Sequence, residues 1–176
     1  MKILRCIHSA DPRIGGPIAN IRGMQHPLEQ RGHDVELASL DAPEAPFFSG
    51  FECPVHPLGP GKGGWGYARR WTDWMKAHLA GYDRVIIHGL WQFPHFSVPS
   101  LARRRGIPYF VYPHGMLDPW FNRRYPWKRV KKQLYWWLAE HRNLAGAQAV
   151  FFTSEEEKVR ARRSFSPYRL REQVVA

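Results

Sequence analysis

The sequence is poor in cysteine and has no long hydrophobic run. Its two cysteines, Cys6 and Cys53, form neither a disulfide framework nor a metal-ligand spacing, so we expect two free thiols in a reducing cytoplasm. No stretch reaches the roughly 18 unbroken apolar residues of a membrane-spanning helix. The N-terminal apolar run lacks a small-residue cleavage site and indicates a strand rather than a signal peptide. The sequence therefore predicts a cytoplasmic protein, either soluble or peripheral on the inner face of the plasma membrane.

Acidic residues are few relative to basic ones. The 15 Asp and Glu residues are outnumbered by 26 Lys and Arg residues, which leaves a formal net charge of +11. Such a field attracts phosphates, anionic lipid head groups or nucleic acid. Composition alone does not choose among these partners, so the choice depends on the motifs.

Common metal- and phosphate-binding motifs are also missing. There is no Asp-X-Asp element and the histidines lack metal-ligand spacing, so we expect no metal. The glycine-rich loop at 59–64 does not end in the Gly-Lys-Ser/Thr of a phosphate-binding loop, which favours a flexible connector. The pair Gly15-Gly16 lacks the third glycine of a dinucleotide-binding turn. No nucleic-acid-binding motif is recognised either, so nucleic acid is not an expected partner.

Patterns typical of strands and helices alternate along the chain. The expected strands cover 3–8, 34–40, 53–58, 84–88, 109–112 and 147–152, with another opening at 174–176, and the expected helices cover 17–31, 67–79, 94–105, 127–144 and 154–163. Such alternation is typical of a parallel sheet with right-handed crossovers. The length allows one core of this kind. We therefore expect a single α/β domain with a doubly wound, Rossmann-like, mostly parallel sheet and helices on both faces.

Three local details qualify this fold prediction. Pro27 lies inside the first expected helix and predicts a kink or an earlier helix end. The polar and apolar alternation at 34–40 favours a strand near a sheet edge. Ser154 and Glu157 have the spacing of a capping box, in which each side chain accepts from the other residue's backbone N–H.

Segments able to bind a ligand follow three of the expected strands. In open α/β sheets, ligands bind at the carboxyl ends of the strands. The candidates are the glycine pair after the first strand, the turn after 84–88 and the turn after 109–112. Their residues are Gly15, Gly16, His88, Trp91, His114, Gly115, Met116 and Asp118. We expect these turns to converge on one cleft.

The glycine pair and His114 each have a functional and a structural interpretation. Gly15 and Gly16 can bring backbone N–H groups and a helix N-terminus close to an anion, or they can form a simple tight turn. His114 can donate to a substrate hydroxyl or carbonyl, and it is half-titrated near neutral pH. Alternatively, it can anchor its loop.

The other polar and aromatic candidates are equally open to two interpretations. His88 ends a buried strand and can bond either a ligand or a neighbouring backbone group. Trp91 can stack on a sugar ring or pack beneath its loop. Asp118 can accept from sugar hydroxyls or make an Asp-Pro turn.

A strongly basic segment follows the third turn. It contains six basic residues and no acid, and its members are Arg123, Arg124, Lys128, Arg129, Lys131 and Lys132. Aromatic residues interleave with them, which is typical of a surface that docks on anionic lipid head groups, at about 1 kcal/mol for each basic residue. The alternative is a solvated helix face with Val130, Leu134 and Leu138 directed inward.

Taken together, these segments resemble the N-terminal domain of GT-B glycosyltransferases of family 4. The similarity covers nearly the whole chain. It rests on Gly-Gly at 15–16, Arg-Gly-His-Asp-Val at 31–35, His-Gly-Leu-Trp at 88–91, Gly-Ile-Pro at 106–108, Pro-His-Gly-Met-Leu at 113–117 and Thr-Ser at 153–154.

The resemblance implies that residues 1–176 form the acceptor-side half of a retaining, metal-independent enzyme of the hexosyltransferase type. Its partners would be a glycan or lipid-linked acceptor and a nucleotide sugar, which acts as co-substrate and binds mainly to a C-terminal domain. No other cofactor is implied. By the same resemblance His114 lies near the transferred sugar as the catalytic residue, and Gly15 and Gly16 lie near the donor phosphates or the acceptor.

One feature of that family has no counterpart here. The paired glutamates that contact the donor are missing, because the adjacent residues Glu155, Glu156 and Glu157 begin a helix and do not substitute for them. We therefore expect the chain to be inactive without a donor domain. A basic nucleic-acid-binding module and a non-catalytic carbohydrate- or membrane-binding domain are the alternative functions.

Overall fold

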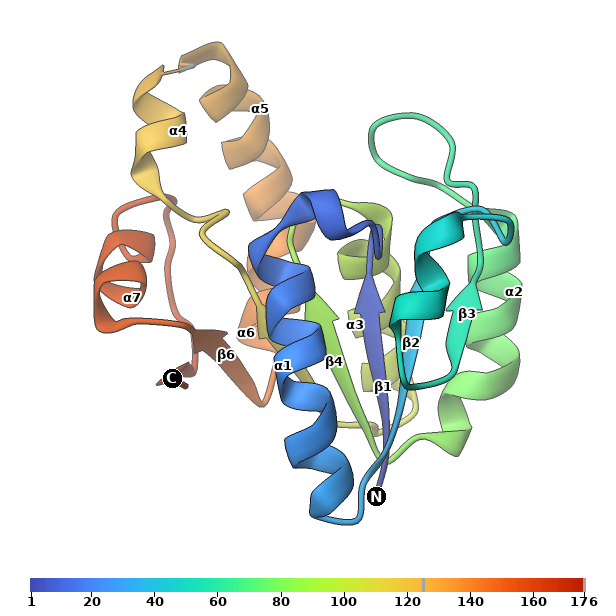
Figure 1. Cartoon of the computed structure of the whole chain (residues 1–176). Helices are drawn as coiled ribbons and strands as arrows, with labels where there is room; N and C mark the ends of the chain where they lie inside the picture. The colour runs from blue at the N-terminus through green and yellow to red at the C-terminus, as the bar shows by residue number, and fades with distance from the viewer. Residues whose placement is uncertain (125, 176) are drawn as a thin grey trace.

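A computed structural model describes residues 1–124 and 126–175, and its centre is a seven-stranded sheet in which every paired strand is parallel (Figure 1). The strand order is β3-β2-β1-β4-β5-β6-β7. The strands are β1 (Lys2–Ile7), β2 (Asp34–Ser39), β3 (Val55–Pro57), β4 (Arg84–His88), β5 (Tyr109–Tyr112), β6 (Ala149–Phe152) and β7 (Glu172–Val174). The expected doubly wound α/β fold is confirmed.

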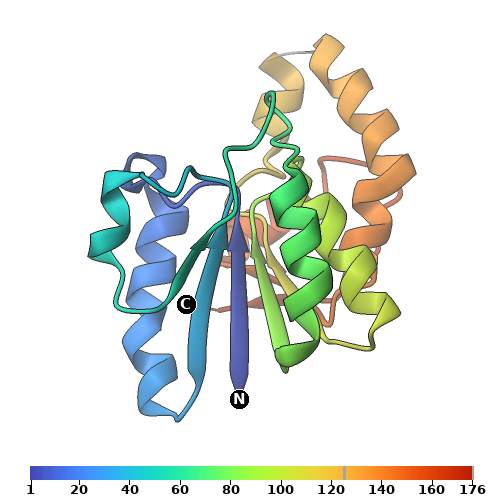
Figure 2. The ribbon, with the colours of Figure 1, turned by 90° about the vertical axis from the view of Figure 1, so that its right-hand side faces the viewer.

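Helices cover both faces of the sheet, as the view along the sheet shows (Figure 2). The α-helices are α1 (Gly16–Gln30), α2 (Arg69–His78), α3 (Phe93–Arg104), α4 (Pro119–Arg124), α5 (Pro126–Tyr135), α6 (His141–Ala145) and α7 (Glu155–Ala161). Short 3-10 turns are η1 (Pro12–Ile14), η2 (Pro46–Gly50) and η3 (Leu79–Gly81), and a π-helical turn, η4 (Trp136–Glu140), joins α5 to α6. Helix α1 and η2 lie on one face, and α2 and α3 lie on the other.

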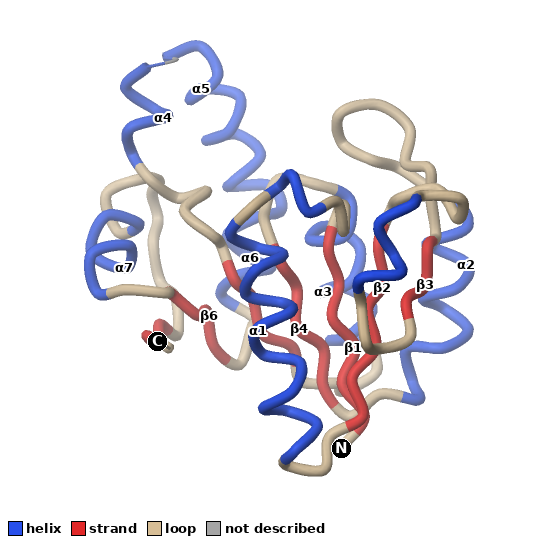
Figure 3. Tube along the Cα trace, in the orientation of Figure 1, coloured by secondary structure: helices blue, strands red, loops and turns tan. Residues whose placement is uncertain are grey.

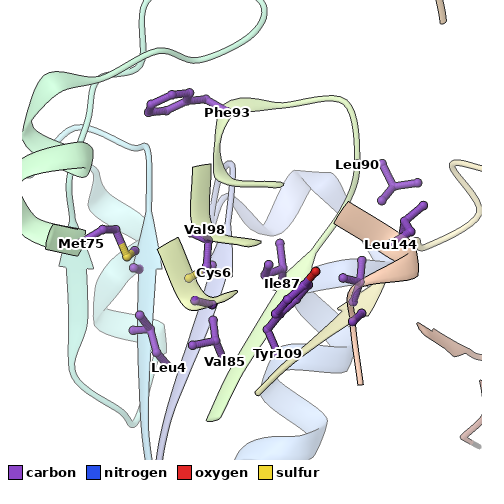
Figure 4. Packing of buried hydrophobic residues seen from close by; sticks show 14 of the residues in the cluster. Leu4, Cys6, Met75, Val85, Ile87, Leu90, Phe93, Val98, Tyr109 and Leu144 are labelled. Carbon is purple, nitrogen blue, oxygen red and sulfur yellow. The ribbon is translucent and has the colours of Figure 1, made fainter. Parts of the chain in front are cut away.

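The alternation of side chains along β1 divides the core between these two faces. Leu4 and Cys6 pack in the larger cluster, together with Met75 of α2 (Figure 4). Trp71 of α2 belongs to the same cluster. Ile7 packs in the smaller cluster under α1. Successive strand residues point to opposite faces, so Arg5 is directed towards α1, the same side as Ile7.

The chain reverses its direction of travel across the sheet between β1 and β4. From β1 it proceeds outward through β2 to β3, then crosses back to place β4 on the other side of β1. Because all strands are parallel, their carboxyl ends share one edge, where the following loops gather (Figure 3). Ligands of doubly wound sheets bind at such a reversal point, so the topology marks the end of β1 and β4 as the candidate site.

Three local expectations can be compared with the structure, and two of them need correction. Helix α1 continues past Pro27 to Gln30, so an earlier end is wrong; the carbonyl four residues back belongs to exposed Gly23, where water can replace the lost hydrogen bond. Strand β2 is second from the edge of the sheet, beside the edge strand β3, so its expected place near a sheet edge is confirmed. The last strand runs over Glu172–Val174 instead of opening at 174.

Candidate functional site

Two strained turns lie at the carboxyl edge of the sheet, after β4 and after β5. Trp91 and His114 have φ values of 68° and 50°, and they are the two non-glycine residues with positive φ in the described part of the chain. Such conformations are uncommon for residues with a Cβ, and they concentrate at functional sites. The backbone therefore singles out the same two turns that the sequence indicated.

A chain of hydrogen bonds joins three charged or titratable side chains at this edge. The buried guanidinium of Arg5 donates from Nε to Nε2 of His88 at 3.3 Å. On the other side of the ring, Nδ1 of His88 lies 2.9 Å from Nε2 of His114. The two imidazoles stack at 16° between planes, and Tyr112 stacks on His88 at 3°. The structure thus brings His88 and His114 into direct contact.

Burial keeps the two histidines of this group neutral, while Arg5 retains its charge. It lowers the pKa of His88 well below its ordinary value, and the nearby Arg5 and His114 lower it further. Burial also lowers the pKa of His114 to about 4, with Glu157 opposing and Arg5 adding to the shift. The pKa of Arg5 falls to about 10 through burial, so the guanidinium stays protonated at neutral pH. Both imidazoles are neutral there.

Arg5 is held by more than the histidine. Only 1% of the residue is exposed, and its Nη1 donates to the carbonyl of Ile21 at 2.8 Å. Its Nη2 donates to Oδ1 of Asn20 at 3.3 Å. These bonds tie β1 and β4 to α1 directly behind the reversal point.

The turn after β4 is fixed by a buried acid and by Met116. Glu140 of η4, with 0% of its surface exposed, accepts the backbone N–H of Trp91 at 2.8 Å. Its other oxygen lies 2.9 Å from Nδ1 of buried His95, close in distance but not aligned for a hydrogen bond. The Met116 sulfur accepts the N–H of Leu90 at 3.1 Å. The strained Trp91 backbone is therefore held by atoms from two other elements.

The indole ring of Trp91 is engaged inside the domain. It packs edge-on against Phe165, lies near Trp136 and donates from Nε1 to the carbonyl of Met116. Lys132 lies over the ring, 4.7 Å from its centroid. A stacking role for Trp91 towards a sugar stays a prediction, although its described contacts serve the loop.

The turn after β5 is tied to α7. Glu157 accepts the N–H of Gly115 at 2.7 Å and the N–H of Thr153 at 2.8 Å. Ser154 accepts the N–H of Glu157 as expected, but Glu157 does not return the bond, so the capping box is half formed. The carboxylate is instead used to hold the loop that carries His114.

A small cavity opens beside this loop. It has a volume of about 180 Å³ and is lined by Gly115, Asp118, Ser154, Glu156, Glu157 and Arg160. Asp118 accepts the N–H of Trp120 and lies 3.2 Å from Arg160, so it makes the turn and an ion pair at once. The cavity combines charges of both signs, which suits a polar ligand.

The glycine pair stands at the start of α1. Gly15 has a φ of 80° and caps the helix, and Gly16 is its first residue. No described side chain would meet a Cβ added at either position, so this end of the helix is open. Pro17 has no N–H and the N–H of Ile18 bonds Gly15, which leaves fewer amides for an anion than the motif indicated.

The basic segment projects beyond the same edge on α4 and α5 (Figure 1). The alternative with Val130, Leu134 and Leu138 inward is wrong, because these three side chains are 55%, 50% and 82% exposed. The π turn explains the difference, since it directs Trp136 and Glu140 into the core instead.

The basic residues themselves do not all share one environment. Arg124, Lys128, Arg129 and Lys131 are exposed, whereas Lys132 is partly buried over Trp91. The side chain of Arg123 lies outside the described part of the structure. Within the described chain, no helix is long and apolar enough to cross a membrane.

Three residues of the site were not predicted from the sequence: Arg5, Glu140 and Glu157. Arg5 had a detectable signal, because a charge within a buried strand needs partners. Glu140 had none, since an acid in a basic helix is typical of a solvated face. Among the described residues, no cluster of three or more His, Cys, Asp or Glu side chains could hold a metal ion.

A family model for the glycosyl transferase 4-like domain matches residues 15–175. The chain belongs to this family. The resemblance to family 4 glycosyltransferases of the GT-B fold is thereby confirmed. A comparison of this glycosyl transferase 4-like domain with curated proteins finds no match.

Solved structures share the fold of this domain at low identity. HepE from Anabaena, in complex with UDP and glucose, is 14% identical, with a TM-score of 0.69 over 99% of this chain and 44% of its own. MurG from Acinetobacter baumannii is 14% identical, with a TM-score of 0.52 over 99% and 46%. MnaA from S. aureus, solved with UDP, is 17% identical, with a TM-score of 0.51 over 94% and 43%. The chain therefore spans less than half the length of each.

The neutral histidine pair predicts a pH dependence of stability. Unfolded histidines titrate near pH 6.5, whereas His114 titrates at about 4 in the fold and His88 well below its ordinary value. The unfolded state then binds more protons in this window, so the free energy of unfolding falls as pH drops from about 6.5 towards 4.

Urea denaturation at several pH values measures this slope. In the variant His114→Gln the slope of the unfolding free energy against pH should be smaller by the contribution of one proton, roughly 1.4 kcal/mol per pH unit. His26→Gln on exposed α1 is the matched control and should keep the wild-type slope. An unchanged slope in His114→Gln would show that His114 is not held neutral.

Proposed function

We propose that this domain is the acceptor-side half of a retaining, metal-independent hexosyltransferase. The reaction would move a sugar from a nucleotide sugar to a polysaccharide or lipid-linked acceptor. The observation that carries the proposal is the contact of His88 with His114 at the reversal point of a sheet of this family. Glycosyl transfer at such an edge needs hydrogen-bond donors held in fixed positions, and the two turns supply them.

A second domain would complete the crevice. The share of HepE that this chain matches is 44%, and that protein was solved with UDP and glucose, which supports a nucleotide sugar as the donor. In this arrangement the donor binds mainly to the second domain, and the carboxyl edge of the present sheet receives the acceptor. Closure of the two halves would exclude water, which otherwise competes with the acceptor.

Within the crevice, His114 is the proposed catalytic residue, bonding an oxygen of the reacting sugar. Gly15 and Gly16 lie at the open start of α1, where the helix dipole favours a phosphate. Gly115 and Asp118 line the cavity beside His114 and would position the sugar. His88, Trp91 and Met116 shape the two turns from behind.

The isolated 176-residue chain is expected to be inactive. In the proposed arrangement a second domain supplies the nucleotide pocket and closes the crevice, so the isolated chain would lack both. The measurement is release of nucleoside diphosphate from a panel of nucleotide sugars, with lipid-linked and polysaccharide acceptors present. Transfer by the chain alone would contradict this part of the proposal.

Replacing His114 tests the assignment of the catalytic residue in the complete polypeptide that carries this domain. His114→Ala should lower turnover by about 100-fold, the order expected when one donor to a developing charge is lost. His26→Ala, on the exposed face of α1, is the control and should retain wild-type turnover. Intact turnover in His114→Ala would remove this residue from the site.

We also propose that α5 docks the domain on an anionic membrane, at the cytoplasmic face where lipid-linked acceptors would be reached. Three large apolar side chains are exposed in this segment: Trp127 at 85%, Trp137 at 59% and Leu138 at 82%. Several exposed apolar side chains in one segment are typical of an interaction surface. Exposed Lys128, Arg129 and Lys131 lie with Trp127 on α5, which continues into the π turn η4 that carries Trp137 and Leu138. Their charge complements that of acidic lipid head groups. The helix projects beyond the edge that holds the site.

Vesicle binding tests this surface. The protein should sediment with vesicles that contain phosphatidylglycerol and much less with vesicles of phosphatidylcholine alone. Lys128→Glu with Arg129→Glu should abolish the difference, and Trp127→Ala should weaken binding. Lys76→Glu with Arg105→Glu, a pair of exposed charges away from α5, is the charge-matched control. Retention on oligonucleotides, with none on acidic vesicles, would favour nucleic acid and contradict docking.

A further inference from the structure

We infer that Arg5 is a positioning residue that places the proton of His114 on Nδ1, so that His114 meets its ligand as a hydrogen-bond donor. The argument follows the direction of each bond in the chain from Arg5 through His88 to His114. It rests on the proposed function only for what His114 then contacts.

The first bond has one possible direction. A guanidinium has five N–H donors and no acceptor. Its Nε lies 3.3 Å from Nε2 of His88, so that ring nitrogen must present a lone pair. The guanidinium cannot rotate away from His88 without losing other hydrogen bonds, because its two other nitrogens donate to Ile21 and Asn20.

The second bond follows from the first. A neutral imidazole with a lone pair on Nε2 carries its proton on Nδ1. In His88 that atom lies 2.9 Å from Nε2 of His114, which must therefore accept. The doubly protonated form of His88 is excluded because the residue is buried beside the guanidinium.

The last ring nitrogen is then a donor. With Nε2 accepting from His88, the proton of neutral His114 resides on Nδ1. This atom bonds no described residue and is not among the buried polar atoms that lack a partner, so it keeps access to solvent. The acid facing the ring, Glu157, already accepts from the backbones of Gly115 and Thr153.

This direction determines which chemistry His114 can perform. A neutral Nδ1–H can donate to a phosphate oxygen, a sugar ring oxygen or a hydroxyl oxygen. It cannot remove a proton from an acceptor hydroxyl, because the lone pair of the ring is already used towards His88. The site thus selects an oxygen ligand and excludes His114 as the general base.

Nitrogen NMR of the histidine side chains measures the inference without substrate. In the ¹⁵N-labelled chain at neutral pH, both His88 and His114 should show a protonated Nδ1 and an unprotonated Nε2. Arg5→Met removes the donor, so His88 should become a mixture of tautomers and His114 should follow. A protonated Nε2 on His114 in the wild type would overturn the inference.

Matched variants separate this effect from a loss of fold. Arg103→Met removes another partly buried arginine, which bonds Tyr109 and Asn143, and should leave both tautomers unchanged. His88→Gln keeps an acceptor for Arg5 and a donor for His114, so it should preserve the proton on Nδ1; His88→Leu should release it. This pair decides the question if Arg5→Met does not fold. Unchanged tautomers in Arg5→Met or His88→Leu would show that the chain of bonds does not direct the proton.

The result is independent of the proposed function. Correct tautomers together with full turnover in His114→Ala would leave the inference standing and contradict the catalytic assignment. Reduced turnover in His114→Ala with the opposite tautomer would do the reverse.

Discussion

A buried guanidinium at the centre of the sheet is the constraint on which the site depends. A charge taken out of water is costly unless its donors are paired. Arg5 meets this requirement with a carbonyl and an amide of α1 and with the imidazole of His88. Those three partners bring β1, β4 and α1 together at one point. The positions of His88 and His114 therefore depend on the hydrogen bonds of Arg5.

The two strained turns are held by acids that come from distant helices. Glu140 supports Trp91 from the π turn, and Glu157 supports the loop of His114 from α7. Positive φ at residues with a Cβ costs about 1–3 kcal/mol, and it persists only where neighbouring structure over-determines it. The π turn is therefore part of the site, because it brings Glu140 inward while leaving Trp137 and Leu138 at the surface.

The large positive charge serves two different environments. Arg5 acts inside the domain, where it orders neutral imidazoles. The exposed cations of α5 lie on a helix that projects beyond the sheet edge and that also exposes Trp127. In the proposed function Arg5 orients the reacting sugar through the two histidines. The cations of α5 hold the domain at the membrane where a lipid-linked acceptor is found. The basic residues of this domain therefore have two separate roles, one in the interior and one at the surface.

The sequence by itself determined the order of strands and helices, the parallel sheet and the turns that carry His88 and His114, because these depend on local periodicity and on turn residues. It also indicated Ser154 as a helix cap. Only the tertiary structure decided which side chains meet: Arg5 and His88 are 83 residues apart, and His88 and His114 are 26 apart. It also turned Glu140 inward and Leu138 outward, through a π turn that no local pattern announces. Contacts across strands depend on register and on helix rotation, which are settled by packing of the whole domain.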